Sequence, residues 1–121
     1  MEETKKEVLK QLKELPRSSI AKKSLMMNGI LIQVNSDKKI IQITNKIGPE
    51  HLELNVKNFK YFTDKIKNSG SVCLGKYAVM AMTDYGVPGS NHVLPTNTTS
   101  KFSSGLNVSE FMKKISYITL S

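Results

Sequence analysis

The chain contains 121 residues, of which 39% are hydrophobic and 23% are charged. This composition is typical of one soluble globular domain. No apolar run approaches the roughly 20 residues that a helix needs to cross a bilayer, and the first residues lack the apolar stretch of a signal peptide. We therefore expect a cytoplasmic protein without a membrane partner.

The formal net charge of +8 is compatible with a nucleic-acid partner. However, Arg17 is the only arginine, although bidentate contacts to bases and phosphates favour arginine. The lysines are also spread along the whole chain. We therefore expect a lysine-rich, solvated surface and no nucleic-acid partner, and we keep a basic nucleic-acid-binding protein as an alternative.

Cys73 is the single cysteine, so an internal disulfide is excluded and a reducing compartment is expected. It lies in the apolar stretch of residues 72–74. In such a stretch a cysteine is more often a small core side chain than a nucleophile, and we predict that role for Cys73.

Two helices are expected in the first 29 residues. Apolar residues recur at helical spacing up to Leu15, and Pro16 ends the first helix. A second helix begins with Ser18 or Ser19 as its N-cap and ends at Gly29. Its apolar residues are expected to face the core, and they are Ile20, Ala21, Leu25 and Met26.

The middle of the chain is predicted to alternate between strands and helices. Residues 30–34 (ILIQV) are rich in β-branched side chains and predict a buried strand. Isoleucines at helical spacing predict a helix that begins after Ser36 and stops at Gly48. Residues 52–54 predict a short strand, and residues 57–68 predict a helix with one apolar face.

The last part of the chain has weaker patterns. Residues 71–74 predict a short buried strand, and residues 77–85 predict a helix. Residues 91–105 are polar and rich in turn formers, which predicts a loop. Residues 108–115 suggest a further helix and residues 115–120 a final strand.

This order of elements predicts α/β layering, with a small, mainly parallel sheet of three or four strands flanked by helices. We expect residues 1–121 to form a single domain, because no linker, repeat or low-complexity tract interrupts them. A sheet of so few strands has open edges, which another chain or a further segment would complete.

Three segments carry residues suited to chemistry. Glu50 and His51 lie in a turn before a strand, and they combine a carboxylate with the side chain best suited to proton transfer at neutral pH. Asp84 lies near a helix end and could be a metal ligand, an orienting group for a histidine, or a cap. His92 lies in a polar loop, where binding residues often occur. Each also has an ordinary reading: a solvated Glu-His pair, a cap and an exposed histidine.

The residues alone do not identify a cofactor site. His51, His92 and Asp84 could supply the three protein ligands of a catalytic zinc, but their spacing does not require it. The sequence contains no glycine-rich dinucleotide fingerprint, no P-loop and no GxSxG nucleophile elbow. Taken without any resemblance, the residues indicate an α/β domain in which two histidines and an aspartate lie in expected loops.

Several segments, taken together, resemble the histidinol dehydrogenase family. In chain order they are LKELPR at 12–17, GPEHLEL at 48–54, GSVCLG at 70–75, DY at 84–85, NHVLPT at 91–96 and SGL at 104–106, followed by Phe111 and Lys113. The resemblance covers essentially the whole chain, and PEHL together with NHVLPT at this separation is highly specific. The chain resembles the second half of the family's catalytic domain, which implies an incomplete Rossmann-like domain.

The resemblance implies the NAD-dependent, two-step oxidation of L-histidinol to L-histidine through an aldehyde. Glu50 and His51 would be the catalytic acid–base pair, in which His51 takes the hydroxyl proton and Glu50 activates the water that attacks the aldehyde. His51, Asp84 and His92 would bind substrate, and Asp84 would also be a ligand of the zinc that holds it. No residue of this chain is implied to bind NAD.

The chain also departs from the family pattern. Family members are much longer, and the resemblance places their other zinc ligands and their NAD-binding residues outside this sequence, one ligand coming from the second subunit of a dimer. One residue more than usual separates Asp84 from His92, and Thr83 replaces a common glycine. We therefore expect the isolated chain to bind neither zinc nor NAD tightly and to be inactive.

Three interpretations are open. The chain is a piece of a working oxidoreductase, either one chain of a split enzyme that associates with a complementary chain carrying the N-terminal half, or a segment cut from a longer enzyme. Alternatively, it is an inactive relic or interaction module that keeps only the fold as a monomer or homodimer, or it is a basic nucleic-acid-binding protein. The presence of Glu50, His51 and Asp84 favours the first interpretation.

Overall fold

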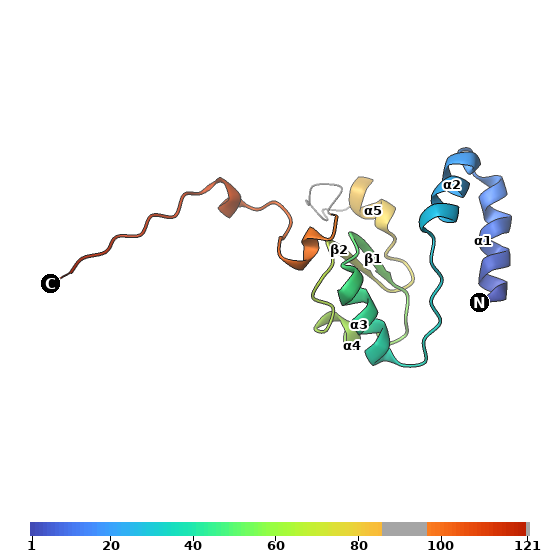
Figure 1. Ribbon diagram of the computed structural model, residues 1–121, viewed down its shortest axis with the longest axis horizontal. Coiled ribbons are helices and arrows are strands. Elements are labelled where there is room, and N and C mark those ends of the chain that lie inside the picture. The colour runs from blue at the N-terminus through green and yellow to red at the C-terminus, as the bar shows by residue number, and fades with distance from the viewer. Residues whose placement is uncertain (86–96, 121) are drawn as a thin grey trace. The chain divides into compact units, whose positions relative to one another are not determined.

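The computed structural model describes residues 1–85 and 97–120 (Figure 1). Its helices and strands, in chain order, are α1 (Glu2–Glu14), α2 (Ser18–Asn28), α3 (Asp37–Ile47), β1 (His51–Leu54), α4 (Lys60–Thr63), β2 (Ser71–Leu74) and α5 (Met80–Tyr85), followed by two 3₁₀ helices, η1 (Thr99–Lys101) and η2 (Val108–Phe111). The chain divides into two compact units, Met1–Asn35 (unit 1) and Ser36–Ser121 (unit 2). That residues 1–121 form a single domain stays a prediction.

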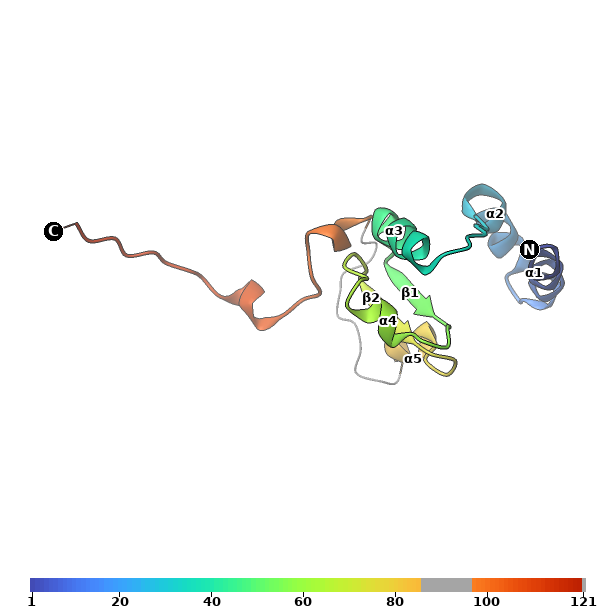
Figure 2. The same ribbon diagram turned by 90° about the horizontal axis from the view of Figure 1, so that it is seen from below.

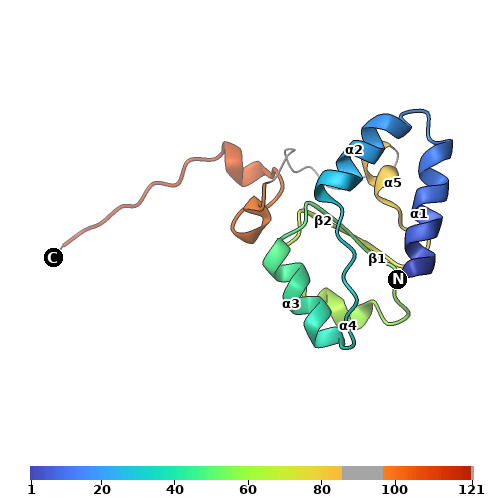
Figure 3. The same cartoon turned by 45° about the vertical axis from the view of Figure 1, so that its right-hand side comes forward.

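Unit 1 is a hairpin of two helices, and both helices were expected from the sequence. α1 and α2 lie side by side (Figure 3). α1 ends where Leu15 turns extended, at φ −75° and ψ 135°, because a residue before proline avoids the helical region. The Ser18 amide then donates to the Leu15 carbonyl at 3.1 Å and closes the turn. Leu12 of α1 is buried between the helices, with 7% of its surface exposed.

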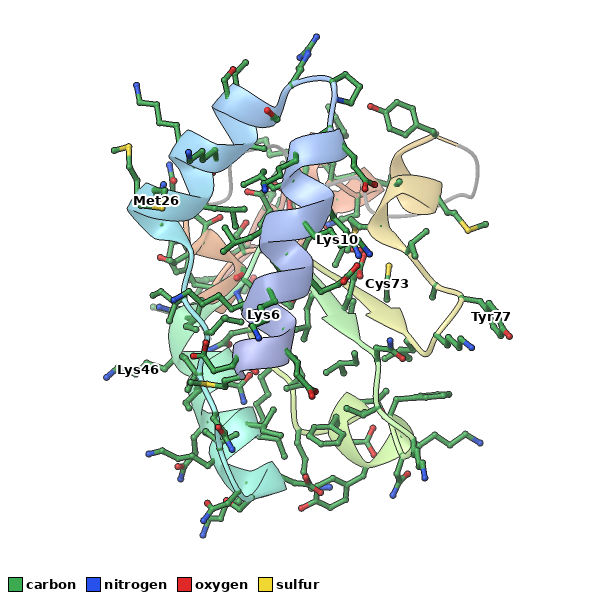
Figure 4. The ribbon with its side chains drawn as sticks, turned by 90° about the vertical axis from the view of Figure 1, so that its right-hand side faces the viewer. Lys6, Lys10, Met26, Lys46, Cys73 and Tyr77 are labelled. Atoms are coloured by element: carbon green, nitrogen blue, oxygen red, sulfur yellow. The ribbon has the colours of Figure 1, made fainter. Side chains whose placement is uncertain are left out.

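The start and the apolar face of α2 differ from the prediction. Neither Ser18 nor Ser19 is the N-cap, since Arg17 occupies that position and makes no capping bond with its side chain. The apolar side chains also do not reach a core: Ile20 is 66% exposed and Met26 is 77% exposed (Figure 4). A helix buries an apolar face only against another element, and among the described elements of unit 1 only α1 covers α2.

The strand predicted for residues 30–34 is wrong. These residues form no strand, and the exposed fractions of Ile30, Leu31 and Ile32 are 78%, 52% and 51%. A strand needs a neighbour to pair its N–H and C=O groups, and the described part of unit 1 contains none. The side chains of Ile30 and Leu31 instead line, with apolar residues of α1 and α2, a cavity of about 260 Å³.

Unit 2 is organised around two parallel strands. β1 pairs with β2 in the register His51↔Ser71 to Leu54↔Leu74, and both strands were expected from the sequence. Parallel neighbours need a long crossover, which residues 55–70 provide with α4 in their middle. The described part of the chain thus holds two strands, fewer than the three or four expected. The small parallel sheet with flanking helices confirms a partial α/β, Rossmann-like domain.

α3 follows the sequence prediction closely. Ser36 is its N-cap and accepts a hydrogen bond from the Lys39 amide at 3.3 Å. Gly48 is its C-cap, in the left-handed region at φ 63° and ψ 60°, where glycine costs least. Figure 2 shows α3 and α5 on opposite sides of the two strands. Because α3 ends at Ile47 and β1 begins at His51, the helix leads directly into the turn before the strand.

The helix predicted for residues 57–68 is confirmed only as α4, which ends at Thr63. The apolar part of the prediction holds, since Phe62 is 3% exposed in the core beside Leu54 and Cys73, which are 5% and 4% exposed. The burial of Cys73 confirms its role as a small core side chain. The helix ends early because the backbone of residues 65–68 bonds to Asn45 of α3.

The C-terminal residues differ from the prediction. The expected helix of residues 108–115 is limited to η2, and residues 115–120 form no strand and are exposed (Figure 1). Apolar residues there lack a described neighbour to pack on, which leaves Ile118 85% and Leu120 93% exposed. The expected loop of residues 91–105 lies outside the described residues up to position 96. Within the described ranges, no helix is long and apolar enough to cross a membrane.

Asn45 is predicted to stabilise unit 2 by holding the segment before β2. Its side chain donates to the Lys65 carbonyl at 2.8 Å and accepts from the amides of Lys67 and Asn68 at 2.8 and 3.2 Å. Asn45→Ala should lower the free energy of unfolding by about 2–3 kcal/mol, at about 1 kcal/mol for each lost bond. The free energy of unfolding is measured by urea unfolding, followed by far-ultraviolet circular dichroism. Gln42→Ala, at an exposed position of the same helix, should change it by less than about 0.5 kcal/mol, and an equal loss would contradict the assignment.

Candidate active site

The turn between α3 and β1 carries the predicted catalytic pair. Gly48 closes α3 by donating its amide to the Thr44 carbonyl at 2.9 Å, and its left-handed conformation redirects the chain. Glu50 and His51 follow at once and are half-buried. The two side chains therefore lie at the amino end of β1, next to each other in the chain.

A buried hydroxyl holds the first carbonyl of this turn. The Ser100 Oγ donates to the Gly48 carbonyl oxygen at 3.1 Å across 52 residues of sequence, and Ser100 is 9% exposed. The contact is tight, because a Cβ on Gly48 would lie 3.0 Å from the Lys101 Cε. η1 is thereby fixed against the turn that carries the predicted catalytic pair.

The next two carbonyls of the turn are held by the start of β2. The Gly70 amide donates to the Pro49 carbonyl at 3.1 Å, and the Ser71 amide donates to the Glu50 carbonyl at 2.9 Å. A Cβ on Gly70 would lie 2.6 Å from the Glu50 oxygen, so only glycine permits this approach. Three successive carbonyls are thus bonded, and the backbone beneath Glu50 and His51 is preorganised.

α5 carries the predicted Asp84 and is attached to β1. The Glu53 Oε1 accepts a hydrogen bond from the Met80 amide at 2.8 Å. Because side chains alternate along a strand, Glu53 projects on the same face of β1 as His51. The helix therefore packs on the face that carries the predicted base. The side chains of Thr83 and Asp84, and all of His92, lie outside the described residues.

A metal site is not complete within the described residues. Across residues 1–85 and 97–120, leaving out the side chains just named, no three His, Cys, Asp or Glu side chains form a cluster that could hold a metal. A catalytic zinc takes three protein ligands, and the side chains that the structure describes form no such set.

A polar cavity of about 330 Å³ adjoins the same edge of the sheet. It lies between the start of β2 and the segment of η1 and η2, and hydroxyl groups dominate its lining. Its lining includes Gly70 and Ser100, which donate hydrogen bonds to the turn, and Ser69, which precedes Gly70. Glu50 and His51 do not line it, so the cavity is not built around the pair.

Sequence reasoning missed two residues that build this site. Ser100 carries no local signal, because its partner Gly48 lies 52 positions away. Glu53 had a signal that could have been used: it is two residues after His51 in a strand, and so on the same face.

A small parallel sheet with flanking helices defines the class of this protein as a partial Rossmann-like domain. A sequence model of the histidinol dehydrogenase family matches residues 1–121. The chain belongs to the histidinol dehydrogenase family. The prediction from its motifs is thereby confirmed.

Relatives in this family share much of the sequence. The chain is 68% identical over 115 residues to histidinol dehydrogenase of Pelagibacter ubique (strain HTCC1062), covering 95% of this chain and 27% of that protein. It is 44% identical over 118 residues to histidinol dehydrogenase of Listeria monocytogenes (strain EGD-e), covering 98% and 27%. It thus spans about a quarter of the length of the curated relatives it matches.

A solved structure supports the same fold. The crystal structure of histidinol dehydrogenase from Elizabethkingia anophelis is similar to this chain with a TM-score of 0.79 and 42% sequence identity. The match covers 89% of this chain and 24% of that one.

Ser100→Ala is predicted to loosen the turn that carries Glu50 and His51. The substitution leaves the Gly48 carbonyl without its buried donor. This loss should lower the free energy of unfolding by about 1–3 kcal/mol. Hydrogen exchange of the Gly70 and Ser71 amides, which bond to the next two carbonyls, should become faster. Ser103→Ala, at an exposed position just after η1, is the matched control and should leave both amides unchanged. Slow exchange in both variants would show that Ser100 does not hold the turn.

Proposed function

We propose that this chain supplies the acid–base residues of a histidinol dehydrogenase, which oxidises L-histidinol to L-histidine in two steps with NAD as electron acceptor. The observation that carries the proposal is the turn before β1, where Glu50 and His51 follow each other on a backbone held by hydrogen bonds from η1 and β2. A general acid or base needs such a fixed position. Membership of the family supports the choice of reaction.

Two proton transfers are assigned to the pair. His51 takes the proton of the substrate hydroxyl as the alcohol is oxidised to the aldehyde. Glu50 takes a proton from the water that adds to the aldehyde carbon, and the hydrate that forms is the species oxidised to the carboxylic acid. One short turn thus serves both oxidation steps.

Asp84 is proposed as the zinc ligand of this chain and, with His51 and His92, as a substrate-binding residue. Support comes from α5, which packs on the face of β1 that carries His51. A single carboxylate does not hold zinc tightly. The remaining zinc ligands and the NAD-binding residues are proposed to lie in the part of the family's length that this chain does not span.

The proposed partner is a polypeptide that carries the N-terminal half of the family's fold, or a second subunit in a homodimer, in the cytoplasm. The many exposed apolar side chains of the described residues support a partner of this kind. An inactive module that keeps only the fold is the second candidate, favoured by the match of this chain to only 27% of the Pelagibacter ubique protein.

Activity is tested in a hybrid enzyme, made by replacing the 115 matched residues of the Pelagibacter ubique protein with those of this chain. We expect histidinol-dependent NADH formation. Glu50→Gln and His51→Asn should lower kcat by about 10²–10⁴, the usual contribution of a general acid or base. Asp64→Asn, an exposed carboxylate at the end of α4, is the control and should retain full activity. A folded hybrid without activity would support the inactive module.

Zinc binding gives a second test. After dialysis against zinc, the isolated chain should retain no stoichiometric metal, because one ligand is not enough. The hybrid should retain zinc and lose most of it with Asp84→Asn, while Asp64→Asn keeps it. Metal content is measured by mass spectrometry of the dialysed protein. A tight, stoichiometric zinc complex of the isolated chain would contradict the proposal that the other ligands come from elsewhere.

A further inference from the structure

We propose that Glu53 is a positioning residue, which places α5 and its Asp84 beside the catalytic His51. The proposal rests on the function proposed above and extends it to a residue outside the acid–base pair. Its basis is the hydrogen bond from the Met80 amide to the Glu53 Oε1, 2.8 Å long and spanning 27 residues of sequence.

The bond acts at the first residue of a helix. The first amides of a helix have no partner within it, and Met80 is the first residue of α5. A carboxylate from β1 therefore fixes both where the helix begins and how close to the strand it lies. The connection before α5 is held as well, because the Gly75 amide donates to the Leu54 carbonyl at 3.0 Å.

The direction of α5 brings its end toward His51. Figure 1 shows α5 running back against the direction of β1. The helix has six residues and rises about 8 Å, while the two steps from Glu53 back to His51 cover about 7 Å. With its start fixed at Glu53, α5 therefore extends back toward the amino end of β1, the strand that begins with His51.

A change at Glu53 therefore reaches the chemistry through the helix. Without the bond, the start of α5 shifts or frays, and the distance between residue 84 and His51 is no longer set. Displacements of about 1 Å in a positioned group can cost about 10²-fold in rate. A purely structural role would predict that stability falls while the effect on activity does not depend on Asp84.

The deciding experiment is a double-mutant cycle in the hybrid enzyme. Glu53→Ala should lower kcat/KM for histidinol about 10–100-fold, and Glu53→Gln, which keeps an acceptor oxygen, should retain most of it. In an Asp84→Asn background, Glu53→Ala should cost little more, because contacts in one network are not additive. Asp64→Ala is the matched control, with no effect in either background. Fully additive losses, or a Gln variant as poor as Ala, would overturn the proposal.

The bond itself is tested without activity in the 121-residue chain. Hydrogen exchange of the Met80 amide should be on the order of fivefold faster in Glu53→Ala, as for a lost helix cap, and unchanged in Glu53→Gln. Unchanged exchange in Glu53→Ala would overturn the role of Glu53 whatever the hybrid does. An inactive wild-type hybrid would overturn the proposed function, whereas an active hybrid in which Glu53→Ala is silent would overturn only the positioning role.

Discussion

The parallel pairing of β1 with β2 determines the position of every functional element in unit 2. It sets His51 opposite Ser71, and this register lets the amides of Gly70 and Ser71 reach the carbonyls of Pro49 and Glu50 in the turn before β1. The same register brings the end of β2 beside the end of β1, from which the chain returns as α5 to meet Glu53. A slip of one residue would turn His51 and Glu53 to the opposite face and separate both from α5.

An isolated sheet of two parallel strands is unusual. Parallel sheets are normally covered on both faces, and two strands alone are marginally stable. The core of unit 2 is correspondingly small, and Val72 in the middle of β2 is 39% exposed. In unit 1, Ile30 and Met26 are even more exposed. The chain spans about a quarter of the length of its relatives. The uncovered apolar surface supports the proposal that further polypeptide completes the core.

The sequence predicted correctly those elements whose ends are set by interactions between residues close together in the chain. Ser36 and Gly48 bound α3 because a cap and a left-handed glycine act within a few residues. Residues 30–34 were predicted incorrectly because a strand depends on a neighbour, and the helix of residues 57–68 is shorter because Asn45 takes its backbone partners. The predicted pair Glu50–His51 has its expected place at a strand start, but Ser100 and Glu53, which hold the surroundings of that pair, depend on contacts across 52 and 27 residues. Such contacts follow from topology, which the motifs do not encode.

The burial of Cys73 has a practical consequence. Cys73 pairs with Glu53 in the sheet, so its side chain lies on the face that α5 covers (Figure 4). It is the only thiol of the chain and is 4% exposed. A thiol reagent can reach it only when the elements around β2 open, and the labelling rate then follows the population of that open state. The chain therefore carries its own single-site reporter of local opening at β2, and no label has to be introduced.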